Sequence, residues 1–334
     1  MAQHSLAAKA LDIFGYQPKL PEKSMQAYRS PSLFQPSKAR QALRDAHEGK
    51  IPPLCGLYLG LSNITTARFI APMGFDVCWI DWEHSSCNVE TMTTMVHEVQ
   101  FMSEGRTIPF VRVPGHDHAA IGYALDAGAS IVVPQVDTVE QAKHIIHAAK
   151  FGRKHNGGRS VPPFRLIPNL TDGRYAPDVH GDVWQAVNDQ AAIMIQIESR
   201  EGIDNLDDIL TQCPEIDAVW IGTLDLRVSM GFPANGGIGG NEPEWHETLG
   251  KYFEITAKHN KPRGGMALGP DEVFSMMQEK LDFIICAAEV LQLMSLQCDL
   301  ERARDMTAHR VKSAKKEEEK DVVIANGKPA NVSA

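Results

Sequence analysis

The stretch AIMIQIESREGIDNLDDIL (192–210) sets a pattern that IDAVWIGTLDLRVSMGFP (216–233) repeats a few residues later. Each begins with a short apolar run rich in β-branched residues, passes through a polar turn and continues with residues at helical spacing. The runs are apolar on both faces rather than alternating, which is typical of parallel strands covered by helices. The stretch therefore predicts two consecutive strand–turn–helix units.

The same unit recurs along most of the chain. Eight apolar runs are present: CGLYLGL (55–61), FDVCWID (75–81), TIPFVRV (107–113), SIVVPQV (130–136), AIMIQIE (192–198), DAVWIG (217–222), PRGGMAL (262–268) and DFIICAA (282–288). Leu54 to Met306 spans 253 residues, close to the roughly 250 of an eight-stranded β/α barrel. The alternative is an open doubly wound sheet, which a G-x-G-x-x-G motif after the first strand would favour. No such motif is present, so we predict a (β/α)8 TIM barrel over residues 54–306.

The two ends of the chain differ from the middle in composition, and neither repeats the strand–turn–helix unit. Residues 1–53 contain six prolines and predict an extended arm, with one short helix that begins after an N-cap at Ser37 and stops at Gly49. Residues 307–334 have mixed charge and almost no aromatic content, which predicts a disordered tail. Two connections, 151–190 and 232–241, are longer than a β/α unit needs. We expect them to form the active-site rim and to carry substrate specificity.

Composition excludes several classes of function. The chain has 334 residues, 33 Lys or Arg, 42 Asp or Glu and a net charge of −9, with no basic cluster of the kind that binds nucleic acid. No apolar stretch approaches the roughly 18–20 residues of a membrane span. The six cysteines never form a C-x-x-C pair, which predicts a reduced cytoplasmic protein without a zinc–sulfur site.

Polar side chains follow the apolar runs where the carboxyl ends of barrel strands should meet. They are Asp81, Glu83, His84, Arg112, Gln196, Glu198 and Asp225. In a β/α barrel this end carries the active site. A structural interpretation stays open for each of them, because an ion pair or a helix cap closing the barrel mouth would use the same residue types.

Glu198 and Asp225 are the most informative pair. They end successive strands, so their carboxylates should lie within reach of one ion, and hard oxygen ligands without Cys or His suit Mg²⁺ or Mn²⁺. A 2-oxo acid could complete the coordination through its carboxylate and keto oxygens, and Arg112 would add a second cation near a developing oxyanion. The turn through Thr223 and Leu224 can offer backbone N–H groups to the substrate carboxylate.

The segment Asp81-Trp82-Glu83-His84 is typical of an acid/base cluster, because a carboxylate can orient an imidazole that moves protons near neutral pH. The histidines at 97, 144 and 147 lie in helical segments and are interpreted as surface or packing residues. His116 and His118 precede a helix and are interpreted as possible caps.

Four segments together resemble the HpcH/HpaI aldolase family of divalent-metal pyruvate aldolases. They are GLYLGLSNITTARFIAPMGFDVCWIDWEH (56–84), residues 109–151, IMIQIESREGIDNLDDI (193–209) and residues 216–233. The resemblance implies a β/α barrel and Mg²⁺ or a similar ion on Glu198 and Asp225. It also implies a 2-oxo acid held by Arg112 and the backbone before Asp225, and His84 with Asp81 as the proton-transfer pair. A further implication is a homohexamer built from dimers that exchange their last barrel helix.

Some residues depart from the usual family pattern. Gly158-Arg159-Ser160 stands where Gly-x-Arg-Gly is common, and Leu226-Arg227 stands where Leu-Ser is common. These departures are similar to a fungal member of the family. That likeness implies decarboxylation of oxaloacetate to a metal-bound pyruvate enolate, which adds to a 2-pyrone and gives a substituted benzoate. A flat pyrone needs a rim with aromatic or hydrogen-bonding side chains, for which Tyr175, Trp82 and Arg112 are candidates. Gln196 is also predicted to bind substrate.

Two other functions remain open from the sequence. One is an aldolase that cleaves or forms 4-hydroxy-2-oxo acids from pyruvate and an aldehyde, in which His84 acts as the base. The other is a barrel that has lost catalysis and only binds a ligand, against which the intact set of Arg112, Glu198 and Asp225 argues.

Overall fold

Eight parallel strands form one closed barrel, as the repeated sequence unit predicts. The computed structural model describes residues 25–30, 35–152, 156–166, 183–237, 239–268 and 271–326. The strands are β1 (Leu54–Leu59), β2 (Val77–Asp81), β3 (Ile108–Arg112), β4 (Ser130–Val133), β5 (Ile193–Ile197), β6 (Ala218–Ile221), β7 (Arg263–Met266) and β8 (Phe283–Ala288). Each strand pairs in parallel with the next, and β1 pairs with β8 to close the ring. The open-sheet alternative is therefore excluded.

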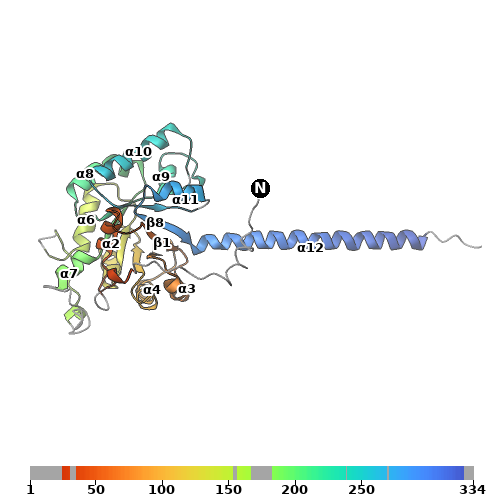
Figure 1. The fold of residues 1–334 in the computed structure, drawn as a ribbon, viewed down its shortest axis with the longest axis horizontal. Helices are drawn as coiled ribbons and strands as arrows, with labels where there is room; N and C mark the ends of the chain where they lie inside the picture. Colours follow the sequence, from red (N-terminus) through yellow and green to blue (C-terminus); the bar gives the residue numbers. More distant parts are fainter. Residues whose placement is uncertain are drawn as a thin grey trace, which may run out of the picture. The chain divides into compact units, whose positions relative to one another are not determined.

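Helices surround the strands (Figure 1). They are α3 (Ile64–Ile70), α4 (Val89–Met102), α5 (His118–Asp126), α6 (Val139–Ala149), α7 (Val183–Gln190), α8 (Arg200–Gln212), α9 (Thr223–Ser229), α10 (Pro243–Lys258) and α11 (Asp271–Gln278). Several of these helices have a short polar N-cap residue whose side chain accepts a backbone N–H of the first turn. These residues are Asn63, Asn88, Asp117, Thr138 and Ser199. The cap of α5 is thus Asp117, and neither His116 nor His118 fills that role.

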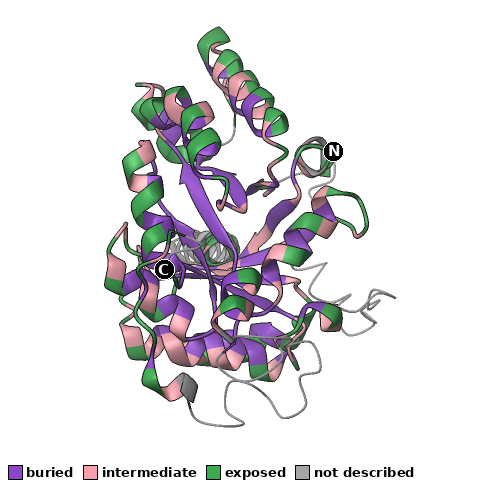
Figure 2. Ribbon diagram, turned by 90° about the vertical axis from the view of Figure 1, so that its left-hand side faces the viewer, coloured by how far each residue is buried: buried purple, intermediate pink, exposed green. Residues whose placement is uncertain are grey.

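The two largest hydrophobic cores among the described residues result from the alternation of side chains along each strand. A third, small cluster contains Ala267, Leu281 and Ile284. One set of positions, such as Cys78 and Ile80 in β2, faces the surrounding helices and joins the outer core. The other set, such as Val77 and Trp79, points into the barrel. There Trp79, Trp220 and Phe283 pack ring against ring, with 4.6 Å between the centroids of the two tryptophans. Figure 2 shows the strands buried and the outer helix faces exposed.

The short N-terminal helix closes the bottom of the barrel rather than belonging to a free arm. Helix α2 (Ala39–His47) contributes Ala39, Ala42, Leu43 and Ala46 to the inner core. Arg40 donates to Asp217 at the start of β6, 2.6 Å away. The predicted stop holds, because Gly49 follows the helix with a φ of 68°. The predicted N-cap is wrong: the cap position is Lys38, and the Ser37 hydroxyl is buried without a hydrogen-bond partner among the described residues.

The C-terminal helix extends further than the sequence predicts. Helix α12 runs from Glu289 to Asn326, so residues 307–326 are helical where we expected a disordered tail, and the expected boundary at Met306 falls inside the helix. The stretch SAKKEEEKD (313–321) explains the difference. It is rich in Ala, Lys and Glu, which have high helix propensity and can form ion pairs one turn apart.

The connection 151–190 is not the rim that we predicted, as far as its described residues show. It follows a helix, α6, and not a strand, so it starts at the amino end of the barrel. Gly158 N–H donates to the carbonyl of His147 in the last turn of α6, and Asn188 of α7 binds both backbone groups of Phe151. The connection 232–241, by contrast, follows β6 and α9 and belongs to the carboxyl end, as predicted.

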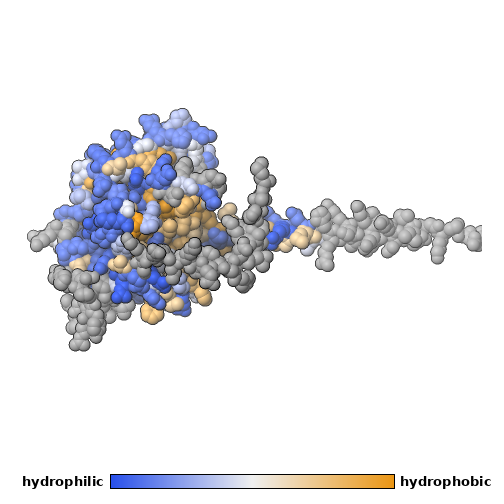
Figure 3. Space-filling view, in the orientation of Figure 1, coloured by the Kyte–Doolittle hydropathy of each residue, from blue (hydrophilic) through white to orange (hydrophobic). Residues whose placement is uncertain are grey.

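Hydrophilic residues predominate on the face of the barrel drawn in Figure 3. Within the described part of the chain, no helix combines the length and the apolar content that crossing a membrane requires. The structure joins none of the six cysteines in a disulfide.

Candidate active site

The inward positions of the strands become polar at the carboxyl end of the barrel. In β2 the inward series runs Val77, Trp79, Asp81, and in β3 it ends on Arg112, which pairs with Asp81 in the strand register. In β5, Gln196 and Glu198 continue the inward series of Met194. Side-chain alternation therefore gathers these polar groups above one apolar floor.

Asp81 and Arg112 form a buried, two-pronged ion pair. Arg112 Nε lies 2.8 Å from Asp81 Oδ1, and Nη2 lies 2.9 Å from Oδ2. The Tyr58 hydroxyl donates to Asp81 Oδ2 at 2.5 Å and accepts from Arg112 Nη2 at 3.0 Å. Burial alone would raise the pKa of Asp81, but Arg112 and Tyr58 outweigh it and hold the pKa below its usual value. Asp81 is thus a fixed carboxylate that orients Arg112.

The histidine predicted to work with Asp81 contacts a different carboxylate. His84 Nε2 lies 3.6 Å from Glu83 Oε2, and its side chain is 67% exposed. Glu83 also lies 3.2 Å from Arg112 Nε. Burial raises the pKa of Glu83, although the charges of Arg112 and His84 oppose the shift. The structure therefore places Glu83, and not Asp81, between His84 and Arg112.

Glu198 is a buried carboxylate, 4% exposed, whose orientation is fixed from two sides. Its Oε1 accepts the backbone N–H of Gln135 at 2.8 Å, and its Oε2 accepts Gln196 Nε2 at 2.9 Å. Gln135 has a φ of 50°, a backbone conformation that is costly for a residue other than glycine and that recurs at functional sites. Burial, reinforced by the negative charges of Asp225 and Glu83, raises the pKa of Glu198 to about 7.

Helix α9 brings Asp225 to the same opening. Asp225 is the third residue of this helix, and its charge acts on the pKa of both Glu198 and Glu83. Thr223 and Leu224 occupy the first turn, whose N–H groups have no side-chain cap. Gly222 before them is required, because a Cβ there would lie 2.2 Å from Glu198 Oε2.

The sequence profile of the HpcH/HpaI aldolase/citrate lyase family matches residues 54–278. The chain belongs to this family. The solved structure of macrophomate synthase is 32% identical, with a TM-score of 0.76, over 87% of this chain and 97% of that chain.

Other relatives in the family are aldolases. The 2-keto-3-deoxy-L-rhamnonate aldolase of Escherichia coli strain K12 is 28% identical over 237 residues, 71% of this chain and 83% of the relative. The 4-hydroxy-2-oxo-heptane-1,7-dioate aldolase of Salmonella dublin is 34% identical over 197 residues, 59% of this chain and 70% of the relative. These names support a carbon–carbon lyase and argue against a barrel without catalysis.

The residues present fit the divalent metal that the family resemblance implies. Glu198 and Asp225 would supply two oxygens, and the remaining positions would go to water and a chelating substrate. Among the described residues, no group of three or more His, Cys, Asp or Glu side chains could hold a metal without such additional ligands. One buried polar atom also lacks a partner there. Gln196 Oε1 makes no hydrogen bond in the described structure, although its amide nitrogen is fixed by Glu198.

Of the two aromatics predicted to bind substrate, the structure describes only Trp82. Trp82 follows the inward Asp81 and therefore points outward, where it packs on the outer core, which favours a packing role. Tyr175 lies outside the described residues. A polar cavity of about 310 Å³ does open beside Glu83, lined further by Gly115, His116, Asp117, Pro134, Gln135, Asp137 and Gln141.

Three residues of the site were not among the candidates from the sequence: Tyr58, Ser62 and Gln135. Glu83 was a candidate, but not as the partner of His84. Tyr58 could have been found, because it shares the inward phase of Leu54 in β1. Ser62 donates to the carbonyl of Asp81 at 2.5 Å and has a φ of 44°. No local sequence signal marks Ser62 or Gln135, because both act through contacts with other strands.

Proposed function

We propose that this protein is a divalent-metal-dependent carbon–carbon lyase that forms a pyruvate enolate from oxaloacetate. In its most specific form, it adds this enolate to a 2-pyrone to build a substituted benzoate, as the likeness to macrophomate synthase suggests. One observation carries the proposal. Two carboxylates with distinct surroundings, Glu198 and Asp225, share an opening with an arginine held by Asp81 and Tyr58.

Each residue has a definite task in this reaction. A divalent ion, Mg²⁺ or Mn²⁺, would act as a Lewis acid on a keto oxygen, and Glu198 and Asp225 would hold it. Arg112 is fixed through Nε and Nη2, and among the described residues its Nη1 has no hydrogen-bond partner. Nη1 would therefore donate to the enolate oxygen. Loss of CO2 leaves its bonding electron pair on the substrate, so this step needs no proton-abstracting base.

The acceptor is tested by incubating the purified protein with Mg²⁺, oxaloacetate and a 2-pyrone. We expect an aromatic carboxylic acid by mass spectrometry, with the summed mass of oxaloacetate and the pyrone less two CO2, one from each reactant, and one water. Detection of pyruvate and CO2 alone would contradict the benzoate-forming reaction, and would leave the enolate-forming lyase in place.

A second candidate is an aldolase that releases pyruvate from a 4-hydroxy-2-oxo acid. The exposed His84 beside Glu83 favours it, because this reaction needs a base that can reach a substrate proton. The polar lining of the cavity next to Glu83 also suits an acceptor aldehyde that carries hydroxyl groups.

Replacing His84 with alanine separates the two candidates. If His84 is the base, exchange of pyruvate methyl protons with deuterated water should fall by about a hundredfold or more, since a positioned base contributes roughly 10² to 10⁴ in rate. Oxaloacetate decarboxylation should change little. Proton NMR measures the exchange, and His259→Ala, on the far side of the barrel, is the control. Unchanged exchange in His84→Ala would exclude His84 as the base.

Metal binding should depend on pH through Glu198. In the metal-free protein this carboxyl has a pKa of about 7, against 4.5 as its ordinary value. Between pH 4.5 and pH 7 this carboxyl is therefore protonated in the folded state and ionised in the unfolded chain. Its contribution to the free energy of unfolding falls as pH rises through this range. Below pH 7, Mg²⁺ must displace that proton, so its affinity should fall about tenfold per pH unit.

Calorimetric Mg²⁺ titrations at pH 6, 7 and 8 measure the affinity, and thermal melts in EDTA measure stability. Relative to the wild type, Glu198→Gln should gain stability between pH 5 and pH 8, by on the order of 3 kcal/mol for a shift of this size. Parallel pH profiles for the two proteins would contradict the assignment.

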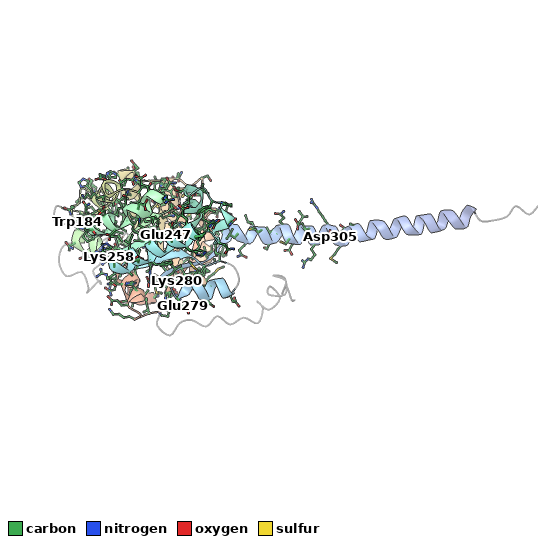
Figure 4. All side chains as sticks on the ribbon, turned by 90° about the horizontal axis from the view of Figure 1, so that it is seen from above. Trp184, Glu247, Lys258, Glu279, Lys280 and Asp305 are labelled. Carbon is green, nitrogen blue, oxygen red and sulfur yellow. The ribbon has the colours of Figure 1, made fainter. Side chains whose placement is uncertain are left out.

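We also propose that the protein is a cytoplasmic homohexamer. Helix α12 exposes a series of large apolar side chains, which are Leu291, Leu293, Met294, Leu296, Leu300 and Met306. Figure 4 labels Asp305 on this helix. Met306 is 68% exposed. Apolar surface of this extent on one helix is typical of an interface. Light scattering of the full chain tests the mass, and a monomer at micromolar concentration would contradict it.

A further inference from the structure

Arg227 has a specific set of partners in the structure. Its side chain is fully buried on α9, two residues after Asp225. Nε donates to the carbonyl of Pro233 at 2.7 Å. Nη1 and Nη2 donate to the two carboxylate oxygens of Glu242 at 3.2 and 2.8 Å. One guanidinium therefore holds both ends of the connection between α9 and α10.

Packing fixes the guanidinium in this position. Its centre lies 5.0 Å from the ring of Trp245 and 5.6 Å from the ring of Phe232. Gly240 passes so close that a Cβ there would lie 2.3 Å from Nη1. The planar guanidinium packs against aromatic rings and donates several hydrogen bonds at once. Lysine cannot make the same contacts, because its ammonium is a single point charge.

The connection that Arg227 holds lies against the proposed substrate-binding segment. Between its two tied ends is the short helix η6 (Asn235–Gly237). A Cβ on Gly237 would lie 2.9 Å from Thr223 Oγ1 and 3.3 Å from Leu224 N. Gly237 itself has a φ of 74°, so glycine is favoured there on both grounds. The wall beside Thr223 and Leu224 is thus made of this connection.

We propose that Arg227 is a positioning residue that sets the wall of the substrate pocket next to Asp225. It does not touch the reacting atoms. By tying Pro233 and Glu242 to α9, it holds Gly237 against Thr223 and Leu224, and so fixes the space available to the substrate. This inference rests on the proposed function, because it assigns those two residues to the pocket that binds the 2-oxo acid.

The test compares Arg227→Lys and Glu242→Gln with the wild type in steady-state decarboxylation of oxaloacetate with Mg²⁺. We expect KM to rise about ten- to hundredfold, the scale of a small misplacement of bound substrate, while kcat stays within about threefold. A purely structural defect would instead reduce the active fraction, and with it kcat, and leave KM unchanged. Hydrogen exchange should rise over residues 223–226 and 232–242, and stay unchanged in the remaining strands.

An exposed pair of the same residue types provides the control. Arg200 and Glu244 join α8 to α10 at the surface, and Arg200→Lys or Glu244→Gln should leave both constants unchanged. If Glu242→Gln and Arg227→Lys fold but keep the KM of the wild type, the inference is wrong. If the wild type itself releases no CO2 from oxaloacetate, the proposed function fails, and this inference fails with it.

Discussion

Replacing Asp225 with Asn, or Glu198 with Gln, should reduce CO2 release from oxaloacetate by about a thousandfold or more. Each change removes one of two carboxylates assigned to the same ion, and a Lewis acid contributes several kcal/mol to stabilising the developing charge. A factor of ten in rate corresponds to about 1.4 kcal/mol. Release of CO2 from oxaloacetate, followed at saturating Mg²⁺, measures the effect.

The matched control is Asp204→Asn. Asp204 lies on α8, pairs with Lys251 at the surface and is 59% exposed, so the same chemical change there should leave the rate unaltered. Calorimetry should also show that the two site variants bind Mg²⁺ weakly or not at all. Turnover of either variant at the wild-type rate would remove that residue from the metal site.

Replacing Arg112 with methionine should have two large effects. It removes the cation that we propose to lie next to the reacting oxygen, and a loss of about 10² to 10³ in kcat is typical of one oxyanion donor. It also leaves Asp81 buried without its ion-pair partner, which costs roughly 3–5 kcal/mol of stability. Thermal unfolding and steady-state kinetics measure the two effects separately.

A second substitution distinguishes catalysis from stability. In the double variant Arg112→Met and Asp81→Asn, the buried charge of Asp81 is removed together with its ion-pair partner, so most of the lost stability should return. Activity should not return. Recovery of both would mean that Arg112 serves only as the structural partner of Asp81.

The fold was largely predictable from the sequence because its signal is local and repeated. Each strand is a short apolar run, and the first strand begins at Leu54 as expected. The extent of the ordered chain was harder to predict. Residues 307–326 are helical because Ala, Lys and Glu have high helix propensity. The mixed charge of this segment led us to predict a disordered tail instead. The role of α2 depends on packing against an inner core whose residues come from seven different strands, which no local pattern records.

The site was predictable only in part, for a similar reason. Strand ends marked Asp81, Arg112, Glu198 and Asp225, and the structure brings them to one opening. The segment 81–84 alone does not indicate which carboxylate contacts His84. The reason is that the carboxylate of Asp81 is paired with Arg112 on the next strand. The role of Gln135 depends on a left-handed backbone conformation, which the sequence does not signal for glutamine.

Metal-dependent decarboxylation tests the central claim most directly. The purified full-length protein is freed of metal with EDTA, and CO2 release from oxaloacetate is then followed while Mg²⁺ or Mn²⁺ is added. We predict negligible release above the uncatalysed rate without metal, and a saturable increase with it that Glu198→Gln and Asp225→Asn do not show. A metal-independent rate, or the same metal response in the two variants, would contradict the account.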